Sequence, residues 1–209
     1  MKKLALLGLA LAVSLGLASA SFAAFSEMTI HVTVQEAGAG IELLFGEDYY
    51  FGDIRVGGTK IDGNNDQTRI FRNNGDTTST WQMQMSEWMD GGGNTPVAES
   101  RWRYLDDTAD PDALPGRNQI RLSALWQLSG DDIRPRPVAA NFRAEDTLTT
   151  TEKRCSATDY GAAGIPDDEK GFNIPASGER QLHLMLQAPA TGSNNLGIPM
   201  RSLLTVTAL

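Results

Sequence analysis

Residues 24–36, AFSEMTIHVTVQE, alternate apolar and polar side chains as a half-buried β-strand does. The apolar face consists of Met28, Ile30, Val32 and Val34. A strand of this kind needs a sheet, and that sheet can belong to its own chain or to a neighbouring copy. The stretch therefore poses a choice between a self-contained domain and a subunit of a polymer.

The chain begins with the pattern of a secretory signal peptide. Lys2 and Lys3 precede an uninterrupted apolar run, and the small residues of SASFAA follow it. Cleavage fits after Ala20 or after Ala23, and the second site makes residues 1–23 the leader. The apolar run is shorter than the roughly 20 residues that a membrane-spanning helix needs. We therefore expect a leader that is removed and a secreted, extracellular or cell-surface protein with no membrane partner.

The mature chain is acidic. Without Lys2 and Lys3 its 18 basic residues fall to 16, against 26 acidic residues, which leaves a net charge of −10. A nucleic-acid-binding protein needs a basic face, so this balance argues against nucleic acid as a partner. An acidic surface favours solubility outside the cell.

Cys155 is the only cysteine, so the chain cannot form an internal disulfide. Its neighbours Lys153 and Arg154 carry positive charge, which lowers the pKa of a thiol. Three interpretations stay open: a buried unreactive thiol, a bridge to another chain, and a catalytic nucleophile, for which no histidine lies nearby in the sequence.

Short strand-like runs separated by turn-forming residues continue along the rest of the chain. They are IELLF (41–45), YYFGDIRV (49–56), TRIFRN (68–73), TWQMQMSEW (80–88), SRWRYL (100–105), NQIRLSALWQL (118–128), PVAANFRA (137–144), RQLHLMLQA (180–188) and SLLTVTAL (202–209). Clusters of glycine, proline, asparagine and aspartate between them supply the turns. This pattern predicts an all-β fold, a two-sheet sandwich of jelly-roll or immunoglobulin-like type, over residues 37–209.

The alternation within these runs also predicts the core. Large apolar residues recur at every second position of three strands, and residues spaced in this way usually pack against a second sheet. The predicted core rows are Ile120, Leu122, Ala124, Trp126 and Leu128; Leu182, Leu184 and Leu186; and Trp81, Met83 and Met85.

Residues 153–179 interrupt the strand pattern. Glycine, proline and charged residues follow one another there without sustained alternation. A loop of this length in a compact domain is usually functional or mobile. Two interpretations stay open, a contact loop and an exposed insertion with a short helical turn at 167–170.

One predicted turn has part of a calcium-loop pattern. Asp62, Asn64 and Asp66 alternate in DGNND, and hard cations bind several oxygens that converge from a tight turn. The pattern then departs from an EF-hand, because Gln67 and Asn73 stand where glycine and glutamate are required. An ordinary hairpin turn explains the same residues, so we expect no cofactor.

The sequence contains no catalytic motif that we recognise. His31 and His183 are its only histidines, and each alternates with apolar neighbours on a predicted strand. This position favours a cross-strand partner or solvent over a nucleophile. A nucleophile elbow, an HExxH pair and a phosphate-binding glycine loop with lysine are all absent from the sequence. We therefore expect a protein that is not an enzyme.

Two stretches resemble a family of exported fibre subunits. In IFRNNGDTTSTWQMQM (70–85) a strand enters an Asn-Gly turn and leaves as a second strand. In residues 178–209 a leucine-rich strand, a turn with proline and glycine, and a final strand follow one another. Both resemble the β-sandwich matrix and pilus subunits of biofilm fibres, including those that polymerise by lending an N-terminal strand to the next subunit. The resemblance implies a sandwich without an active site that forms a head-to-tail homopolymer.

Other fibre types fit less well. The last strand lacks the aromatic ending of chaperone-usher pilins, and no prepilin cleavage motif precedes a long helix. An LPxTG sorting signal is also absent from the sequence. These three routes of assembly or attachment are therefore disfavoured.

A secreted carbohydrate-binding module is the alternative function. Flat aromatic side chains can stack on sugar rings, and the candidates are Trp88, Trp102, Tyr104 and Trp126. The alternation places Trp126 inward and puts Trp102 and Tyr104 on one face. Most of the four are therefore expected in the core or in an interface.

The fate of the first strand decides between a monomer and a polymer. Residues 35–40, QEAGAG, form a small flexible hinge before the next run. A first strand that pairs within its own chain covers an edge of its own sheet. A strand that swings out fills a neighbour's groove by β-strand addition, and such contacts propagate a filament because they do not close. The polymer interface would then consist of Met28, Ile30, Val32 and Val34.

Overall fold

In the computed structural model the protein consists almost entirely of strands and loops. The described residues are 25–35 and 90 (backbone only), 40–45, 48–62, 69–89, 102–105, 115–129, 136–161, 166, 170–190 and 199–209. The helical segments among them are two single 3-10 turns, η1 (Ala139–Asn141) and η2 (Ala144–Asp146). In this part of the chain no helix is long and apolar enough to cross a membrane.

The first of two sheets has the strand order β11-β6-β13-β1-β3, with β7 also paired to β13. Its strands are β1 (Phe25–Gln35), β3 (Asp48–Arg55), β6 (Trp81–Met85), β7 (Met89–Asp90), β11 (Lys153–Arg154) and β13 (Met200–Ala208). β1 and β13 run parallel, and the other described pairs of this sheet are antiparallel.

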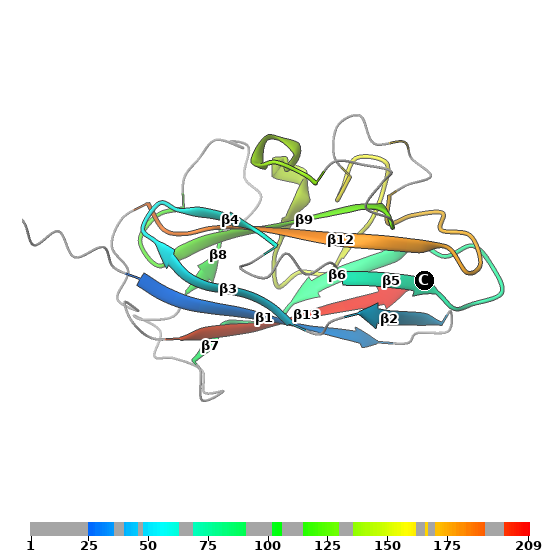
Figure 1. Ribbon diagram of the computed structural model, residues 1–209, viewed down its shortest axis with the longest axis horizontal. Coiled ribbons are helices and arrows are strands. Elements are labelled where there is room, and N and C mark those ends of the chain that lie inside the picture. The colour runs from blue at the N-terminus through cyan, green and yellow to red at the C-terminus, as the bar shows by residue number, and fades with distance from the viewer. Residues whose placement is uncertain are drawn as a thin grey trace, which may run out of the picture.

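The second sheet has the order β10-β9-β12-β5-β2, with β4 paired to β12 and β8 to β9. Its strands are β2 (Ile41–Phe45), β4 (Thr59–Ile61), β5 (Arg69–Asn73), β8 (Arg103–Tyr104), β9 (Gln119–Leu128), β10 (Thr147–Leu148) and β12 (Glu179–Gln187). In Figure 1, β9 and β12 run along one layer while β1 and β13 run along the other. The prediction of an all-β fold with two sheets is confirmed.

The two sheets meet at a cluster of aromatic side chains. Trp81 of β6 lies edge-on to Trp126 of β9, with 4.9 Å between ring centroids, and Phe71 of β5 lies 5.1 Å from Trp126. All three side chains are fully buried. Such T-shaped pairs add to the free energy that burial itself contributes, because ring edges are positive and ring faces negative. The core rows predicted from the alternation are buried, except that Leu128 at the end of β9 is half-buried.

The strand predicted at 137–144 is wrong. This segment contains η1 and lies over the outer face of the second sheet, where Phe142 packs against Leu125 and Met185. The side chain of Asn141 accepts a hydrogen bond from the backbone N–H of Val138 at 2.8 Å. Such local bonds compete with a strand ladder, which explains the turn. Because the segment covers Leu125 and Met185 while the main core covers the inner face, the middle of β9 and β12 is buried on both faces.

The described part of loop 153–179 is anchored to the core. The backbone N–H of Cys155 donates to Trp81, that of Trp126 donates to Tyr160, and Ile174 forms a β-bridge with Ser79. This anchoring argues against a wholly exposed insertion, and the contact-loop interpretation stays untested. Residues 167–169, with most of the expected helical turn, lie outside the described residues. Cys155 is 2% exposed, and burial raises the pKa of its thiol well above the usual range. These features favour the buried, unreactive thiol among the three interpretations.

Gly171 lies in this anchored loop with almost no space for a side chain. A Cβ added there would lie 2.5 Å from the Trp126 ring and 2.8 Å from the sulfur of Cys155. We expect Gly171→Ala to lower the free energy of unfolding by about 1–3 kcal/mol, the cost typical of overpacking a core. The measurement is urea denaturation followed by tryptophan fluorescence.

Gly161→Ala is the matched control. Its added Cβ would also meet close neighbours, but these are the side-chain carbons of Lys170, which a flexible chain can move. The loss should therefore be smaller than at Gly171. Equal losses at both glycines would contradict the packing argument.

Candidate functional site

The place that β1 fills is the main candidate site. β1 lies inside the first sheet, between β13 on one side and β3 on the other (Figure 1). The described residues give β3 no other partner in this sheet. We call the space between β13 and β3 the groove. β1 therefore occupies an interior position of the sheet and not its outer edge.

The register with β13 is continuous. Met28 to Gln35 pair in parallel with Met200 to Thr207 without interruption. The predicted interface positions 28, 30, 32 and 34 stand opposite Met200, Ser202, Leu204 and Val206, whose side chains are buried. The side chains of β1 itself lie outside the described residues, so their role in filling the groove stays a prediction.

The register with β3 contains a bulge. Met28 stands opposite Gly52 and Thr29 opposite Tyr50, so Phe51 is the extra residue of β3. Gly52 has a φ of 58°, a left-handed conformation that glycine adopts without steric cost. Strict alternation would place Ile54 on the opposite face of the strand from Tyr49 and Phe51. The bulge shifts the alternation, so all three side chains are buried. These three side chains form the β3 wall of the groove.

The groove also adjoins the aromatic residues that were candidates for sugar binding. Trp88 lies 5.8 Å from Trp102 and 5.5 Å from Tyr104, measured between ring centroids. The hydroxyl groups of Tyr104 and Ser202 lie 2.6 Å apart, which ties this cluster to β13. Trp88 and Trp102 are 0% and 2% exposed, and Trp126 lies in the main core. These three indole faces are therefore closed to solvent.

A surface pocket of about 270 Å³ lies over this cluster. Its charged and polar rim comes from three segments that are far apart in the sequence. The lining residues are Glu87, Trp88, Trp102, Arg103, Tyr104, Thr149 and Thr150. No local sequence pattern indicates this rim, because only folding brings the residues after β6 and β10 beside β8.

Asp62, the first of the calcium candidates, is buried in a different arrangement. Its Oδ2 lies 2.6 Å from Nδ1 of His183 and 3.4 Å from Nε of Arg136. Its Oδ1 accepts the backbone N–H of Leu184 at 2.9 Å. Both carboxylate oxygens thus already have protein donors, which a calcium ion would have to displace.

The other calcium candidates, Asn64 and Asp66, lie outside the described residues. Within the described ranges, no three histidine, cysteine, aspartate or glutamate side chains are grouped as metal ligands. The expectation of no cofactor stays a prediction, because Asn64 and Asp66 are not described. His183 also approaches the side-chain nitrogen of Gln127 on β9 at 2.7 Å, in agreement with the expectation of a cross-strand partner. His31 lies in β1, where the side chains are not described.

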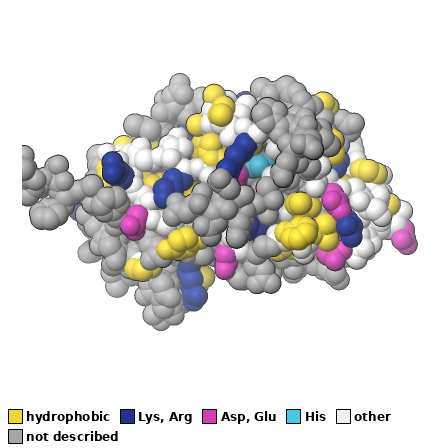
Figure 2. Space-filling model, viewed as in Figure 1, with side chains coloured by type: hydrophobic (Ala, Val, Ile, Leu, Met, Phe, Trp, Pro, Cys, Tyr) yellow, Lys and Arg dark blue, Asp and Glu magenta, His cyan; other side chains and the backbone are white. Residues whose placement is uncertain are grey.

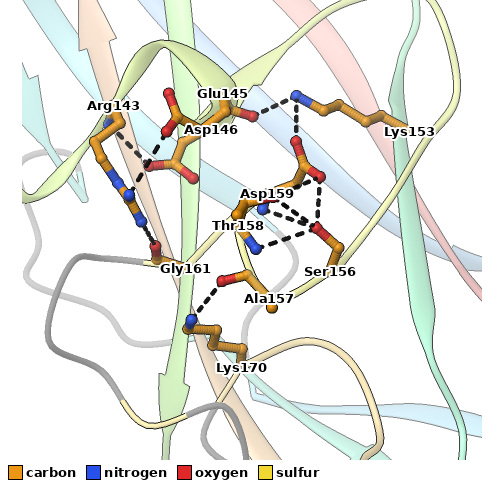
Figure 3. A network of polar contacts seen from close by, with 10 residues as sticks. All are labelled: Arg143, Glu145, Asp146, Lys153, Ser156, Ala157, Thr158, Asp159, Gly161 and Lys170. Atoms are coloured by element: carbon orange, nitrogen blue, oxygen red, sulfur yellow. Dashed lines mark hydrogen bonds and ion pairs between the residues drawn. The ribbon is translucent and has the colours of Figure 1, made fainter.

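A polar network joins the loops between η2 and β12 (Figure 3). Lys153 binds the backbone carbonyl of Glu145 and lies 3.0 Å from the carboxylate of Asp159, which also accepts a hydrogen bond from Ser156 at 2.5 Å. Lys170 donates to the carbonyl of Ala157. These bonds link turns to one another. The network therefore fits a structural role.

Asp146 is the most perturbed acid of this network. It is fully buried, and its carboxylate accepts the backbone N–H of Arg143 at 2.8 Å. Burial raises the pKa of Asp146 to about 6, and the hydrogen bond from Arg143 opposes that rise. The carboxyl group of Asp146 therefore stays protonated up to a higher pH in the folded chain than in the unfolded chain.

The pH dependence of stability follows from the raised pKa of Asp146. Between about pH 4 and pH 6 the folded chain binds more protons than the unfolded chain, so stability falls as the pH rises through this window. We expect the free energy of unfolding of the native protein, relative to Asp146→Asn, to drop by about 2–3 kcal/mol from pH 4 to pH 7. Denaturation series at fixed ionic strength measure this difference.

Asn141→Ala is the control for the Asp146 measurement. It removes a turn hydrogen bond of η1 without removing a titratable group, so its difference from the native protein should stay constant over the same pH range. A difference between native protein and Asp146→Asn that does not change with pH would contradict the raised pKa.

No protein-family model matches the sequence, and no curated protein matches it significantly.

Proposed function

We propose that this protein is a non-enzymatic structural subunit of an extracellular filament, a pilus-like or matrix fibre assembled by β-strand addition. The observation that carries the proposal is the interior position of β1 between β13 and β3. A strand that precedes the rest of the domain, yet fills a groove with partners on both sides, can be replaced there by the same strand of another copy.

Removal of the leader, which we propose as part of this function, would leave β1 as a free end. A free end can leave the groove without threading through the rest of the fold. The proposed product is secreted and remains outside the cell or at its surface. Its sandwich would be of jelly-roll or immunoglobulin-like type, which is the fold that the resemblance to fibre subunits implies.

The energetics of exchange permit polymer formation. A donated β1 would make the same ladders with a neighbour's β13 and β3 as it makes with those of its own chain. The exchange therefore breaks and forms equivalent hydrogen bonds. One copy donates through its strand and accepts through its groove, which are different surfaces. Contacts of this heterologous kind propagate unless the rotation between copies closes them. The partner of this chain is therefore a further copy of itself, in a homopolymer.

Deletion of residues 24–35 tests the proposal. The shortened protein should remain soluble, should be less stable because its groove is open, and should no longer polymerise. A synthetic peptide of residues 24–35 added in trans should restore its melting temperature. Fibres formed by the shortened protein, or an intact protein that stays monomeric after refolding at high concentration, would refute strand donation. Negative-stain microscopy and analytical ultracentrifugation provide the readout.

Carbohydrate binding is the second candidate function. The observation that favours it is the pocket over Trp88, Trp102 and Tyr104, where aromatic and polar side chains converge as they do in sugar sites. The burial of both indoles argues against stacking on an open platform. A sugar would therefore enter the pocket through its rim.

Titration with polysaccharides separates the two candidate functions. A binding module should give a saturable change in tryptophan fluorescence that Arg103→Ala weakens, because Arg103 lines the pocket. Arg154→Ala, at an equally exposed arginine on β11, is the matched control and should leave the titration unchanged. Absence of any saturable change is the result expected of a filament subunit.

A further inference from the structure

We infer that strand exchange brings like ends of two copies together, and that the surface at this end is the contact between neighbouring subunits. This inference rests on the proposed function. We call this surface the hinge end, because it lies where β1 stops and β2 starts. Its exposed residues are Asn74, Asp76, Thr77, Thr78, Pro175, Ala176, Ser177 and Leu209.

The connections of β1 locate the hinge end. β1 stops at Gln35, which stands opposite Thr207 of β13. The described chain resumes at Gly40, whose carbonyl accepts the backbone N–H of Asn74 at 2.8 Å. In Figure 1, the carboxyl terminus and β2 lie together at one end of the molecule, and β1 starts at the other.

Covalent reach then limits how far apart two exchanging copies can be. After exchange, Gln35 stands opposite Thr207 of the neighbouring copy, while Gly40 remains beside Asn74 of its own copy. Five residue steps separate Gln35 from Gly40, and a fully extended chain covers at most about 17 Å in that length. The two hinge ends must therefore approach each other to within about that distance.

The far end of the sandwich cannot satisfy this limit. At that end Phe25 pairs with Arg55, and Val56 lies exposed in the next turn. Ten residue steps of β1 separate Phe25 from Gln35, which corresponds to about 33 Å along a strand. A contact between far ends would leave the hinge too short to reach the neighbour's groove.

The hinge end is also rigid. The buried Asn73 side chain donates to the carbonyls of Thr77, Ile174 and Pro175 at 2.8, 2.9 and 3.1 Å. Its backbone N–H donates to Gly178, and its carbonyl accepts from Ser177. The turns at 74–78 and 174–178 are thus fixed to one residue. A surface held in this way loses little conformational entropy when a partner docks.

The charge of the hinge end suits contact with a second copy. The chain carries a net charge of −8, so two copies repel each other at long range. Asp76 supplies the only charged side chain among the exposed hinge-end residues named above. Arg72 lies on the neighbouring corner of β2 and β5 and is paired with Glu42 and Glu179. Figure 2 shows basic and acidic groups beside hydrophobic ones at this corner. The exposed hinge-end residues named above therefore add little charge to the surface that the hinge requires to approach a second copy.

Two single-cysteine substitutions test the inference in the full mature chain. Asn74→Cys places a thiol at the hinge end, and Val56→Cys places one at an exposed site of the far end. The native protein is the blank, because Cys155 is buried and its pKa is raised. Each protein is assembled at high concentration, treated with a flexible bis-maleimide and analysed by denaturing gel and microscopy.

The inference predicts crosslinked dimers for assembled Asn74→Cys and none for Val56→Cys. Filaments that crosslink through Val56→Cys but not through Asn74→Cys would overturn the inference and leave the filament proposal intact. Closed pairs that crosslink through Asn74→Cys would support the inference and overturn the filament. A protein that stays monomeric overturns both.

Discussion

The two backbone ladders of β1 are the interaction on which the first sheet depends. One ladder joins β1 to β13 over eight residue pairs, and the other joins it to β3 over seven. Without β1, an open row of N–H and C=O groups would face the groove on each side, next to buried side chains such as Phe51 and Leu204. Unpaired polar groups in such a place cost free energy, so the groove requires a strand. Which copy supplies that strand is the functional question.

Much of the fold was predictable because its long strands carry apolar residues at every second position of one face. β9, β12 and β13 appear in the sequence as uninterrupted runs with apolar residues at every second position, and the structure places those residues in the core. The error at 137–144 arose from residues that suit a strand by composition but are held in a turn by the side chain of Asn141. The two-residue strands β10 and β11 were missed because so short a segment has no period.

The candidate site was predictable only in part, since its partners are distant in the sequence. The apolar row of β1 identified a strand, but nothing local indicates that it lies parallel to β13 at the other end of the chain. Asp62 illustrates the same limit. Its spacing from Asn64 and Asp66 suggested a cation, whereas the structure surrounds its carboxylate with His183, Leu184 and Arg136 from distant segments.

The ladders that join β1 to β13 and β3 also determine when one copy can exchange β1 with another. A short linker holds a strand near its own groove at an effective concentration of about millimolar. The chain's own β1 therefore outcompetes the β1 of a neighbour at ordinary protein concentrations. Leaving the groove breaks both ladders at once, which makes departure from a finished monomer resemble partial unfolding and therefore slow. Exchange is faster from chains in which β1 has not yet docked. Assembly by strand donation would therefore be fastest from chains that are still folding at high local concentration, and a monomer that has closed its own groove would join the proposed fibre only slowly.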